Sequence, residues 1–579
     1  GVAWIVKPLV YYQFGLYRRV WVYASIQELK LITIAVTFAS VVLFVLITVI
    51  QFFSVFDEFS RGAVVIDWLL SLVCVGGLRF SFRLLAENQS SSRNKNTRSR
   101  RVLIVGAGSA GSLVVKEMQK NPLGGLSPVC FVDDDPTKQK NEIHGVPVVG
   151  KLDDLPRIIE IRHIDEVIIA IPSAPGEVVR KVADLCRKAG VAFRTMPSLH
   201  ELIGGKVSVN RLREVDITDL LRREPTHLDS TLIGQSLTDR RVLVTGAGGS
   251  IGRELCLQIA HWSPSELILL GHGENSIFEA LVELSESYPG LSIHPVIADV
   301  RDADRLLNIL HQYQPQVVFH AAAHKHVPLM EANVPEAVAN NILGTRNIVQ
   351  VALQCNVERL VMISTDKAVR PSSVMGATKR IAELIVLHAA RESGRAYSVV
   401  RFGNVLGSRG SIVPIFKRQI TRGGPVTITH PDMERYFMTI PEAVHLVLQA
   451  SAMGIGGETF VLNMGKQIRI LTLAEDLIRL SGLEPGKDIE ITFTGIRPGE
   501  KLSEALWYEG AEYQPTAHPD IVTLVGEESL VGKTLEQAIE NLTRLAAEGK
   551  SEGIIDLFDQ SIPGCSLGGQ AEIDVISVV

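Results

Sequence analysis

A glycine-rich turn near the middle of the chain restricts the fold more than any other feature. The apolar run RVLVT at residues 241–245 predicts a buried strand, and it continues into the turn TGAGGSIG, which ends at Gly252. Glycines let the backbone approach a pyrophosphate, and a helix that begins near Ser250 offers free N–H groups and its positive dipole end to phosphates. Further apolar strands alternate with helical segments, at residues 265–270, 291–300, 316–323 and 358–365. The pattern predicts an α/β fold with a doubly wound parallel sheet.

An earlier segment repeats this order of elements. The run RVLIV at residues 101–105 leads into the turn GAGSAG at residues 106–111, and a helical pattern follows. A further strand ends at Asp133, about where a ribose-binding acid is expected, and another strand is predicted at residues 166–171. We find no catalytic constellation before residue 229. Two interpretations stay open for this segment: a nucleotide pocket, or a Rossmann-like scaffold without a ligand of its own.

Length and composition divide the chain into domains. At 579 residues it is too long for one ordinary hydrophobic core. We predict transmembrane helices at residues 1–87, a polar and basic linker at 88–100, and two Rossmann-like domains at 101–229 and 230–579. The chain begins with Gly1 rather than Met, and its first residues look like the end of an apolar segment, so we expect an N-terminal truncation.

Two apolar runs near the N-terminus predict membrane crossings. Residues 31–56 carry no charge, and this run is long enough to span a bilayer at about 20 residues per helical crossing. Residues 62–78 form a shorter run that contains Asp67. The alternative, a buried hairpin of a soluble domain, is disfavoured because the first run has no polar face for water. We therefore expect a lipid bilayer as a partner of this region.

Basic residues predict the orientation of these crossings. Arg18 and Arg19 precede the first run, and only a short turn at residues 57–61 separates the two runs. Seven more basic residues follow the second run: Arg79, Arg83, Arg93, Lys95, Arg98, Arg100 and Arg101. Because positive residues favour the cytoplasmic side, both outer flanks and both Rossmann-like domains are predicted to be cytoplasmic.

Charge and cysteine content argue against two other classes of function. The net charge of -5 mixes both signs, and no basic helix or aromatic-basic array gives a reason to expect nucleic acid as a partner. The six cysteines are scattered, without a CxxC pair or the histidine spacing of a zinc site. We predict no metal site and no disulfide framework, which fits a reducing compartment.

Motifs in the second half of the chain resemble a known enzyme family. Several motifs together resemble those of the extended short-chain dehydrogenases that act on nucleotide sugars. They are the glycine turn, ADV (298–300), HAAAHKHVP (320–328), Asn340-Asn341 and STDK (364–367). Four later motifs resemble the large membrane-bound UDP-N-acetylglucosamine 4,6-dehydratases of bacterial polysaccharide biosynthesis: VMGATKR (374–380), RFGNVLGSRGSIVP (401–414), HPDMERYFM (430–438) and GIRPGEKLSE (495–504). The resemblance covers nearly the whole chain.

This resemblance implies a function and a location. It implies that residues 230–579 form an NAD-dependent nucleotide-sugar dehydratase, a hydro-lyase. Its product would be a UDP-4-keto-6-deoxy-N-acetylhexosamine for bacterial surface polysaccharide or glycoprotein glycans. The resemblance also implies a multi-pass protein of the bacterial inner membrane and leaves a homo-oligomer open.

The family motifs imply roles for individual residues. NAD contacts are implied for Gly246, Gly249, Ser250, Ile251, Gly252, Asp299, Val300, Ala321, Ala322, Ala323 and Lys379. Two phosphates need cationic forks and amide donors. UDP-sugar contacts are implied for Lys325, His326, Asn404, Arg435, Arg497 and Glu500. The implied catalytic residues are Thr365, Asp366, Lys367 and Lys379.

One departure from the wider superfamily shapes the predicted mechanism. The usual pattern is Tyr-x-x-x-Lys, but Met375 stands four residues before Lys379, and a thioether cannot perform acid–base chemistry. The large dehydratases resemble this chain in having Met there. By resemblance, Asp366 is the acid for the C6 oxygen, Lys367 is the base at C5, and Thr365 is hydrogen-bonded to the C4 oxygen. A hydride leaves C4 for the cofactor and returns to C6.

A second departure concerns the cofactor. Gly271 stands where an Asp or Glu normally binds the adenosine ribose, and the nearest replacements are His272 and Glu274. This weakens the distinction between NAD and NADP. No arginine stands ready for a 2'-phosphate, so we predict NAD.

Three other functions compete with the dehydratase. A nucleotide-sugar 4-epimerase or ketoreductase would share the fold and the cofactor, but Met375 and the Asp366-Lys367 pair disfavour it. A non-catalytic membrane protein that senses UDP-sugars is compatible with Met375 and Gly271, whereas the retained Thr365 and the two lysines argue against it. A membrane-bound phosphosugar transferase would share the front half, but its catalytic segment is absent here.

Overall fold

The chain divides into two compact units in the computed structural model. Unit 1 comprises Gly1–Arg100 with Leu123–Leu126, and unit 2 comprises Arg101–Pro122 with Ser127–Val579. The residues that the structure describes are 3–14, 26–52, 62–63, 65–75, 77, 99–120, 125–196, 213–220, 230–508, 510–525 and 532–567. The arginines and the turn on which the predicted orientation depends lie outside them, apart from Arg100 and Arg101.

Unit 1 is helical. It contains α1 (Ala3–Gln13), α2 (Ile26–Phe52) and a shorter apolar helix, Val65–Val75. Of the described helices, only α2 is long and apolar enough to cross a membrane, with a mean hydropathy of 2.7 over Ile32–Val49. The prediction of several crossings is therefore not confirmed. Asp67, which interrupts the second predicted run, forms an ion pair with Lys7 of α1 at 2.6 Å.

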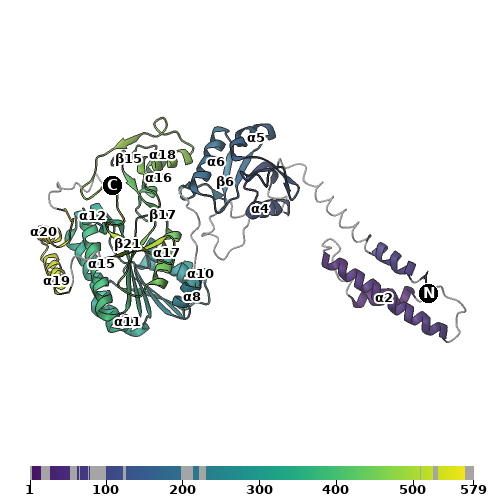
Figure 1. The fold of residues 1–579 in the computed structure, drawn as a ribbon, viewed down its shortest axis with the longest axis horizontal. Helices are drawn as coiled ribbons and strands as arrows, with labels where there is room; N and C mark the ends of the chain where they lie inside the picture. The colour runs from purple at the N-terminus through teal and green to yellow at the C-terminus, as the bar shows by residue number, and fades with distance from the viewer. Residues whose placement is uncertain are drawn as a thin grey trace. The chain divides into compact units, whose positions relative to one another are not determined.

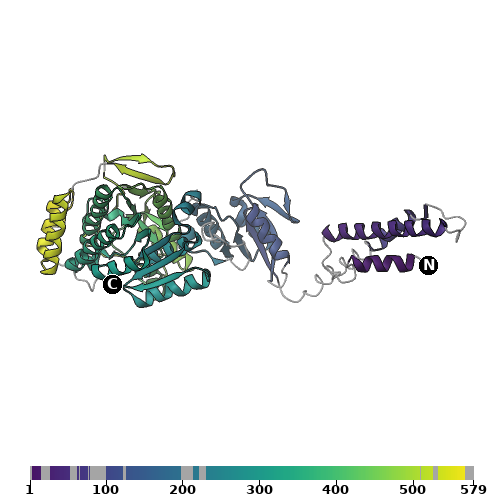
Figure 2. The ribbon, with the colours of Figure 1, turned by 90° about the horizontal axis from the view of Figure 1, so that it is seen from below.

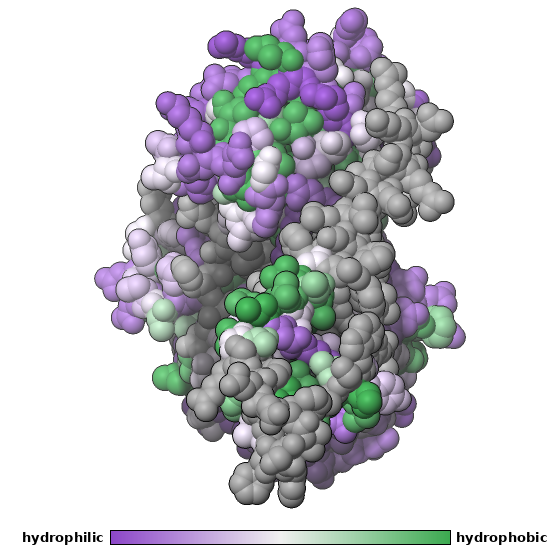
Figure 3. Space-filling model, turned by 90° about the vertical axis from the view of Figure 1, so that its right-hand side faces the viewer, coloured by the Kyte–Doolittle hydropathy of each residue, from purple (hydrophilic) through white to green (hydrophobic). Residues whose placement is uncertain are grey.

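Much of the apolar surface of α2 is exposed. Buried side chains on one side of the helix pack against Val10 and Tyr11 of α1. Other apolar side chains of α2 are exposed, including Ile34, Phe38, Val41, Val45 and Val49. Figure 3 shows hydrophobic residues in green at the surface, among hydrophilic residues in purple. So many exposed apolar groups on one helix are unfavourable in water.

The first sheet of unit 2 carries the earlier glycine turn (Figure 1). Its order is β3-β4-β2-β1-β5-β6-β7. The strands are β1 (Arg100–Val105), β2 (Leu126–Val132), β3 (Glu142–Ile143), β4 (Val146–Gly150), β5 (Glu166–Ile169), β6 (Ala192–Thr195) and β7 (Arg213–Glu214). The helices are α4 (Ser109–Lys120), α5 (Leu155–Arg162), α6 (Gly176–Lys188) and α7 (Ile217–Leu220). β1, β5 and β6 pair in parallel, as the alternation of strands and helices predicts.

The second sheet has nine strands in the order β10-β9-β8-β11-β12-β13-β18-β22-β21. These are β8 (Arg241–Thr245), β9 (Glu266–Gly271), β10 (Ile293–Ile297), β11 (Val317–His320), β12 (Arg359–Thr365), β13 (Ala396–Phe402), β18 (Thr459–Leu462), β21 (Glu512–Pro515) and β22 (Ile521–Val525). The seven strands from β10 to β18 are parallel, and β22 and β21 add antiparallel pairs. The predicted doubly wound parallel sheet is confirmed for this domain.

Helices cover both faces of this sheet, because its strands are apolar on both sides. One face packs against α11 (Ala303–Tyr313), α14 (Gly344–Gln354) and α15 (Val374–Ser393). The other face packs against α8 (Ser230–Leu237), α9 (Ser250–His261), α10 (Glu274–Ser287) and α17 (Ile440–Met453). Two C-terminal helices, α19 (Lys533–Ala547) and α20 (Ser551–Ser561), lie side by side (Figure 2).

Short segments at the carboxyl edge of the second sheet form a lobe over the site. Three two-stranded sheets build it: β14 (Asn404–Leu406) with β17 (Phe437–Thr439), β15 (Val426–Ile428) with β20 (Ile491–Phe493), and β16 (Glu434–Arg435) with β19 (Ile468–Arg469). The helices α16 (Ile412–Thr421) and α18 (Ile470–Leu480) pack against these strands. The lobe is made by the same segments that carry the later sequence motifs.

Candidate active site

A cavity of about 780 Å³ opens at the carboxyl ends of the parallel strands. The glycine turn after β8, the loops after β11, β12 and β13, and the lobe all contribute to its wall. In open α/β sheets ligands bind at this edge, where the strand order reverses. The order β9-β8-β11 places that reversal beside the glycine turn. Both the fold and the cavity therefore point to one site.

The glycine turn forms a tight cradle at one end of the cavity. Gly246 has φ +68°, and a Cβ there would lie 2.8 Å from the backbone nitrogen of Ala322. A Cβ at Gly252 would lie 2.1 Å from the carbonyl oxygen of Gly246. α9 begins at Ser250, as the sequence predicts. The turn thus brings bare backbone and a helix N-terminus to the cavity wall, which fits the diphosphate of a dinucleotide.

The structure separates the predicted cofactor residues into two groups. The cavity is lined by Gly246, Gly249, Ser250, Ile251, Gly252, Ala321, Ala323 and Lys379. Asp299, Val300 and Ala322 are not among its lining residues. The Asp299 carboxylate pairs with Arg301 at 2.6 Å, and hydrogen bonding from Arg301 lowers the pKa of Asp299. Ala322 instead supports the turn, because its N–H donates to Thr245 Oγ1 at 3.3 Å.

The departure at Gly271 has a local packing reason. Gly271 is the last residue of β9, and a Cβ at this position would lie 3.0 Å from Ile277 Cδ1. Ile277 is buried in α10, so it leaves little room for an acidic side chain. A contact with the adenosine ribose must come from other groups nearby.

The predicted catalytic residues Thr365, Asp366 and Lys367 are in contact with one another. Thr365 ends β12, and its hydroxyl donates to Asp366 Oδ1 at 2.8 Å. The Lys367 ammonium donates to the same carboxylate oxygen at 3.0 Å and to Asn404 Oδ1 at 3.1 Å. Asp366 is fully buried, whereas Thr365 and Lys367 line the cavity. An acid, a base and a hydroxyl therefore meet at one strand end.

The two lysines of the site have opposite pKa shifts. Burial alone would lower the pKa of Lys367, but the carboxylates of Asp366 and Glu504 outweigh burial and raise it. Burial lowers the pKa of Lys379 to about 8, against the opposing pull of Glu383. The Lys379 ammonium donates to the carbonyl oxygen of Ile363 at 2.8 Å. Lys367 is held as a cation, while Lys379 loses its proton much more readily.

Met375 lies where the superfamily places a tyrosine. It is in the first turn of α15, which Ser373 caps by accepting a hydrogen bond from the Gly376 N–H. The Met375 side chain is buried and lines the cavity. The position is therefore part of the site, although it carries no group that can transfer a proton.

The predicted substrate residues all line the cavity, but several already have partners. Lys325 donates to Ser408 Oγ at 3.3 Å, and burial lowers its pKa. Arg435 donates to the carbonyl oxygens of Glu434 at 2.7 Å and Leu502 at 3.1 Å. These contacts hold the Arg435 guanidinium in a fixed place at the cavity wall.

The remaining substrate residues differ in their environment. His326 is exposed at the cavity wall, and desolvation by its surroundings lowers its pKa, with the charge of Lys325 adding to the effect. Arg497 and Glu500 belong to one turn, in which the Glu500 N–H donates to the Arg497 carbonyl oxygen at 3.0 Å. Asn404, predicted to bind the nucleotide, instead accepts a hydrogen bond from Lys367. The structure thus places Asn404 with the catalytic cluster.

The cavity wall carries a surplus of positive charge. Among the described residues that line it are six cationic side chains and two carboxylates. The cations are Lys325, Lys367, Lys379, Arg409, Arg435 and Arg497, and the carboxylates are Glu500 and Glu504. Such a wall favours a ligand that bears several negative charges, as diphosphates do.

Two lining residues with acidic or cationic side chains were not predicted as site residues from the sequence. Glu504 is buried, and its Oε1 lies 3.8 Å from the Lys367 ammonium. Arg409 contacts the start of α9 and a side chain of α10. Its backbone N–H donates to Ser250 Oγ at 3.1 Å, and its guanidinium pairs with Glu279 at 2.6 Å. Both residues lie inside motifs that carry the family resemblance, so the motifs were the available signal.

The earlier glycine turn is arranged differently. Asp133 Oδ2 accepts a hydrogen bond from the Ala107 N–H at 2.7 Å, within the turn itself. The same carboxylate pairs with Lys138 at 3.2 Å. The acid that was expected near a ribose therefore has partners in its own domain.

Comparisons with known proteins match two separate parts of the chain. A family profile described as "Polysaccharide biosynthesis protein" matches residues 242–525, and one described as "CoA-binding domain" matches residues 13–197. The capsular polysaccharide biosynthesis protein CapD of Staphylococcus aureus is 47% identical over 500 residues, covering 86% of this chain and 82% of that protein.

Two shorter relatives match the second domain and differ in their named activities. The UDP-N-acetylglucosamine 4,6-dehydratase (inverting) of Campylobacter jejuni is 32% identical over 272 residues, covering 46% of this chain and 77% of its own. The UDP-glucose 4-epimerase of Rickettsia canadensis is 34% identical over 278 residues, with the same shares covered. Sequence identity alone does not decide between these two activities. The two activities require different side chains at the site.

Proposed function

Because this chain belongs to the polysaccharide biosynthesis protein family of extended short-chain dehydrogenases, we propose that it is an NAD-dependent UDP-N-acetylglucosamine 4,6-dehydratase. Its product would be a UDP-4-keto-6-deoxy-N-acetylhexosamine for surface polysaccharide or glycoprotein glycans. One observation carries the proposal: Thr365 and Lys367 line the cavity of the glycine turn and both donate hydrogen bonds to the buried Asp366 carboxylate behind them, with Met375 in place of a tyrosine.

The residues at one end of the cavity fit NAD. The glycine cradle and the N-terminus of α9 would hold the diphosphate, and the alanines Ala321 and Ala323 leave room for the dinucleotide against the sheet. Lys379 would contact the nicotinamide ribose. Bound there, NAD would supply the hydride chemistry of the reaction, with oxidation at C4 of the sugar and reduction at C6.

The chain's own residues would handle the protons. Oxidation at C4 makes the C5 proton acidic, so a modest base suffices for the elimination. Lys367 would take the C5 proton while Asp366 protonates the departing C6 hydroxyl, which leaves as water. Before that step the single proton of the pair must sit on Asp366, and the 3.0 Å contact offers a direct path for this transfer.

The other end of the cavity suits the UDP moiety. Arg435 and Arg497 are guanidinium groups on the lobe, and two phosphates are well matched by such planar cationic forks. Lys325 and His326 follow the alanine run in the sequence, and both line the same cavity. Thr365 would hydrogen-bond the C4 oxygen of a sugar placed between the two ends.

We also propose a membrane location. The exposed apolar side chains of α2 support a helix that spans or enters a bilayer. The basic residues on both flanks of the apolar runs favour a cytoplasmic side for both Rossmann-like domains. UDP-sugars would then reach the cavity from the cytoplasm of a bacterium.

A second candidate function is a nucleotide-sugar 4-epimerase, which the Rickettsia relative favours. Both activities begin with oxidation at C4, which needs a group that takes the C4 hydroxyl proton, a task that Met375 cannot perform. Met375 therefore does not separate the two activities. Epimerisation, however, has no use for an acid and a base in contact at C5 and C6, so the Asp366-Lys367 pair favours dehydration.

The test is to incubate the full-length protein in detergent with UDP-N-acetylglucosamine and to analyse the products by mass spectrometry. Loss of one water from the sugar nucleotide, without net NADH at 340 nm, is the expected result. An unchanged mass with UDP-N-acetylgalactosamine formed would support the epimerase instead. Binding of UDP-sugar without any turnover would support a sensor and overturn the proposal.

A further inference from the structure

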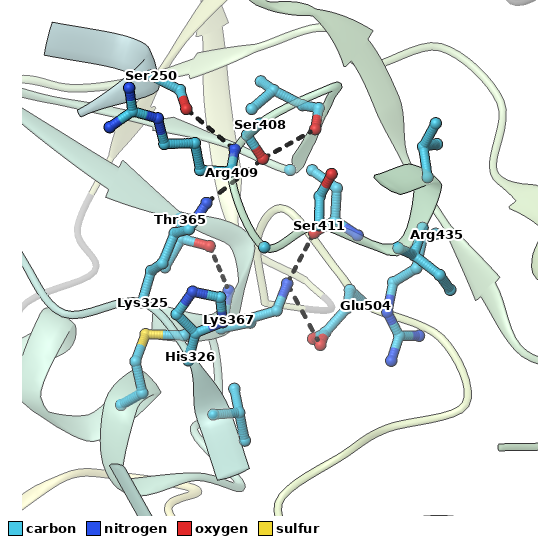
Figure 4. Close-up of a pocket in the computed structure, with 18 of the residues that line it drawn as sticks. Ser250, Lys325, His326, Thr365, Lys367, Ser408, Arg409, Ser411, Arg435 and Glu504 are labelled. Atoms are coloured by element: carbon cyan, nitrogen blue, oxygen red, sulfur yellow. Dashed lines mark hydrogen bonds and ion pairs between the residues drawn. The ribbon is translucent and has the colours of Figure 1, made fainter. Parts of the chain in front are cut away.

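Glu504 has no role in the reaction as described so far, although it lies in the same cavity. It is only 5% exposed and belongs to the loop that follows β20. Figure 4 shows Lys367 extending toward Glu504, with a dashed line between the ammonium and the carboxylate. The two groups are 3.8 Å apart, which is an ion pair without a hydrogen bond.

The second oxygen of this carboxylate is also notable. Glu504 Oε2 is buried and accepts no hydrogen bond from any residue that the structure describes. Its nearest cation is Lys501, at 3.8 Å, and the Lys501 ammonium already donates to the carbonyl oxygens of Val369 and Arg370. A buried carboxylate without a hydrogen-bond donor is costly, which argues for a functional reason to keep it.

Four charged groups act on the Lys367 ammonium. Asp366 and Glu504 are negative and favour its protonated form, whereas Arg435 and Lys501 are positive and oppose it. Asn404 adds a neutral acceptor at 3.1 Å. In the proposed elimination Asp366 is a neutral acid before the step and a carboxylate after it, so Glu504 is the group whose negative charge lies beside Lys367 throughout.

We propose that Glu504 is a positioning residue of the dehydration. It holds the Lys367 side chain in the cavity and stabilises the ammonium that forms on Lys367 when this residue takes the C5 proton. This inference rests on the proposed function. In the step concerned, the C5–H bond breaks and its proton passes to Lys367 Nζ. The electron pair forms the C5–C6 double bond, and the C6–O bond breaks as Asp366 donates its proton to the leaving water.

The charge of Glu504 should affect how the dehydration rate falls at alkaline pH. The reactive site holds one proton on the Asp366-Lys367 pair, so turnover falls on the alkaline side when this proton is lost. The carboxylates of Asp366 and Glu504 raise the pKa of Lys367, so the wild-type rate should hold further into the alkaline range than an unpaired lysine would allow. Removing the charge of Glu504 should move the alkaline fall to lower pH.

The experiment compares the full-length wild type with Glu504→Gln, which keeps the shape and removes the charge, and with Glu504→Asp, which keeps the charge. Glu490→Gln, on the exposed end of the same segment, is the matched control. Two quantities are measured from pH 7 to 11: the dehydration rate, and the acetic anhydride labelling rate of Lys367, followed by mass spectrometry of its peptide.

We expect the alkaline limb and the labelling titration of Lys367 to move together in Glu504→Gln and to return toward wild type in Glu504→Asp. An unmoved titration of Lys367 in Glu504→Gln, or the same movement in Glu490→Gln, would overturn the inference. If the wild type makes no dehydrated product, the proposed function fails, while the labelling titration still tests whether Glu504 acts on Lys367.

Discussion

The two glycine turns of this chain follow the same order of strand, turn and helix, yet they are used differently. At the first turn, the acid expected for a ribose is present, and its carboxylate binds the Ala107 N–H and Lys138. At the second turn the acid is missing, because Gly271 stands in its place. The second turn borders a cavity of about 780 Å³ that also holds two of the three candidate catalytic residues at the end of β12. The motif alone therefore does not locate the chemistry.

The difference lies in what gathers at the carboxyl edge of each sheet. In the second domain, the loops after β12 and β13 and the lobe bring Lys367, Asn404 and Glu504 to one point. In the first domain Asp133 stabilises its own turn, which favours the scaffold interpretation of that domain. The comparison teaches that a dinucleotide motif becomes a candidate active site only through the side chains that later segments supply.

The largest difference in dehydration rate is expected between variants of two carboxylates, Asp366 in the second domain and Asp133 in the first. Asp366→Asn should lower the dehydration rate by about 10²- to 10⁴-fold, because the C6 oxygen loses its acid. Asp133→Asn should leave the rate within about twofold and lower the melting temperature, since a hydrogen bond to a charged group contributes about 1.5–3 kcal/mol. Steady-state rates and thermal melts of both full-length variants check this. Equal rate losses would mean that the first turn also takes part in turnover.

Matched glycines should separate cofactor binding from folding. In Gly252→Ala, the new Cβ would meet the Gly246 carbonyl oxygen at 2.1 Å, so the cradle must open. We expect NAD affinity to fall about tenfold or more, or about 1.4 kcal/mol. Gly108→Ala meets open space in the first turn and should leave NAD affinity unchanged. Titration calorimetry with NAD measures both, and a loss of affinity in Gly108→Ala would contradict the assignment of the cofactor to the second turn.

The smallest effect is expected from a pair of lysines, of which one should make stability depend on pH between 8 and 10 and the other should not. The pKa of Lys379 is about 8 in the fold and about 10.5 when unfolded, so the unfolded chain binds more protons between these values. The stability of the wild type relative to Lys379→Met should therefore rise from pH 8 to 10. Asp133 raises the pKa of Lys138, so the difference between wild type and Lys138→Met should stay constant over this range. The melting temperature of each variant is measured without NAD from pH 8 to 10. A constant difference between wild type and Lys379→Met over this range would contradict the prediction.

Sequence patterns predicted the frame of the molecule well, because periodicity and glycine turns are local signals. The strand at 241–245, the helix start at Ser250 and the parallel sheet are confirmed. The contact between Thr365, Asp366 and Lys367 was also within reach, since these residues are consecutive at a strand end. The prediction of several membrane helices went further than the described residues support.

Long-range contacts account for what the sequence did not predict. Glu504 is 137 residues from Lys367 in the chain, and only the loop after β20 brings them together. Asn404 lines the cavity as predicted for a substrate contact, and its hydrogen bond from Lys367 joins segments that lie apart in the chain. In both cases the partner was set by packing that no local pattern records. The ion pair of Asp299 with Arg301, two residues away, is by contrast a local contact.

The central claim is that Lys367 handles the C5 proton at a site without a tyrosine. The most direct measurement is deuterium incorporation at C5 of UDP-N-acetylglucosamine products in D₂O, by the full-length wild type and Lys367→Met, with NAD binding checked for both. The account predicts a deuteron at C5 in the wild-type product and none with Lys367→Met. Deuterium at C5 with Lys367→Met at the wild-type rate would contradict it.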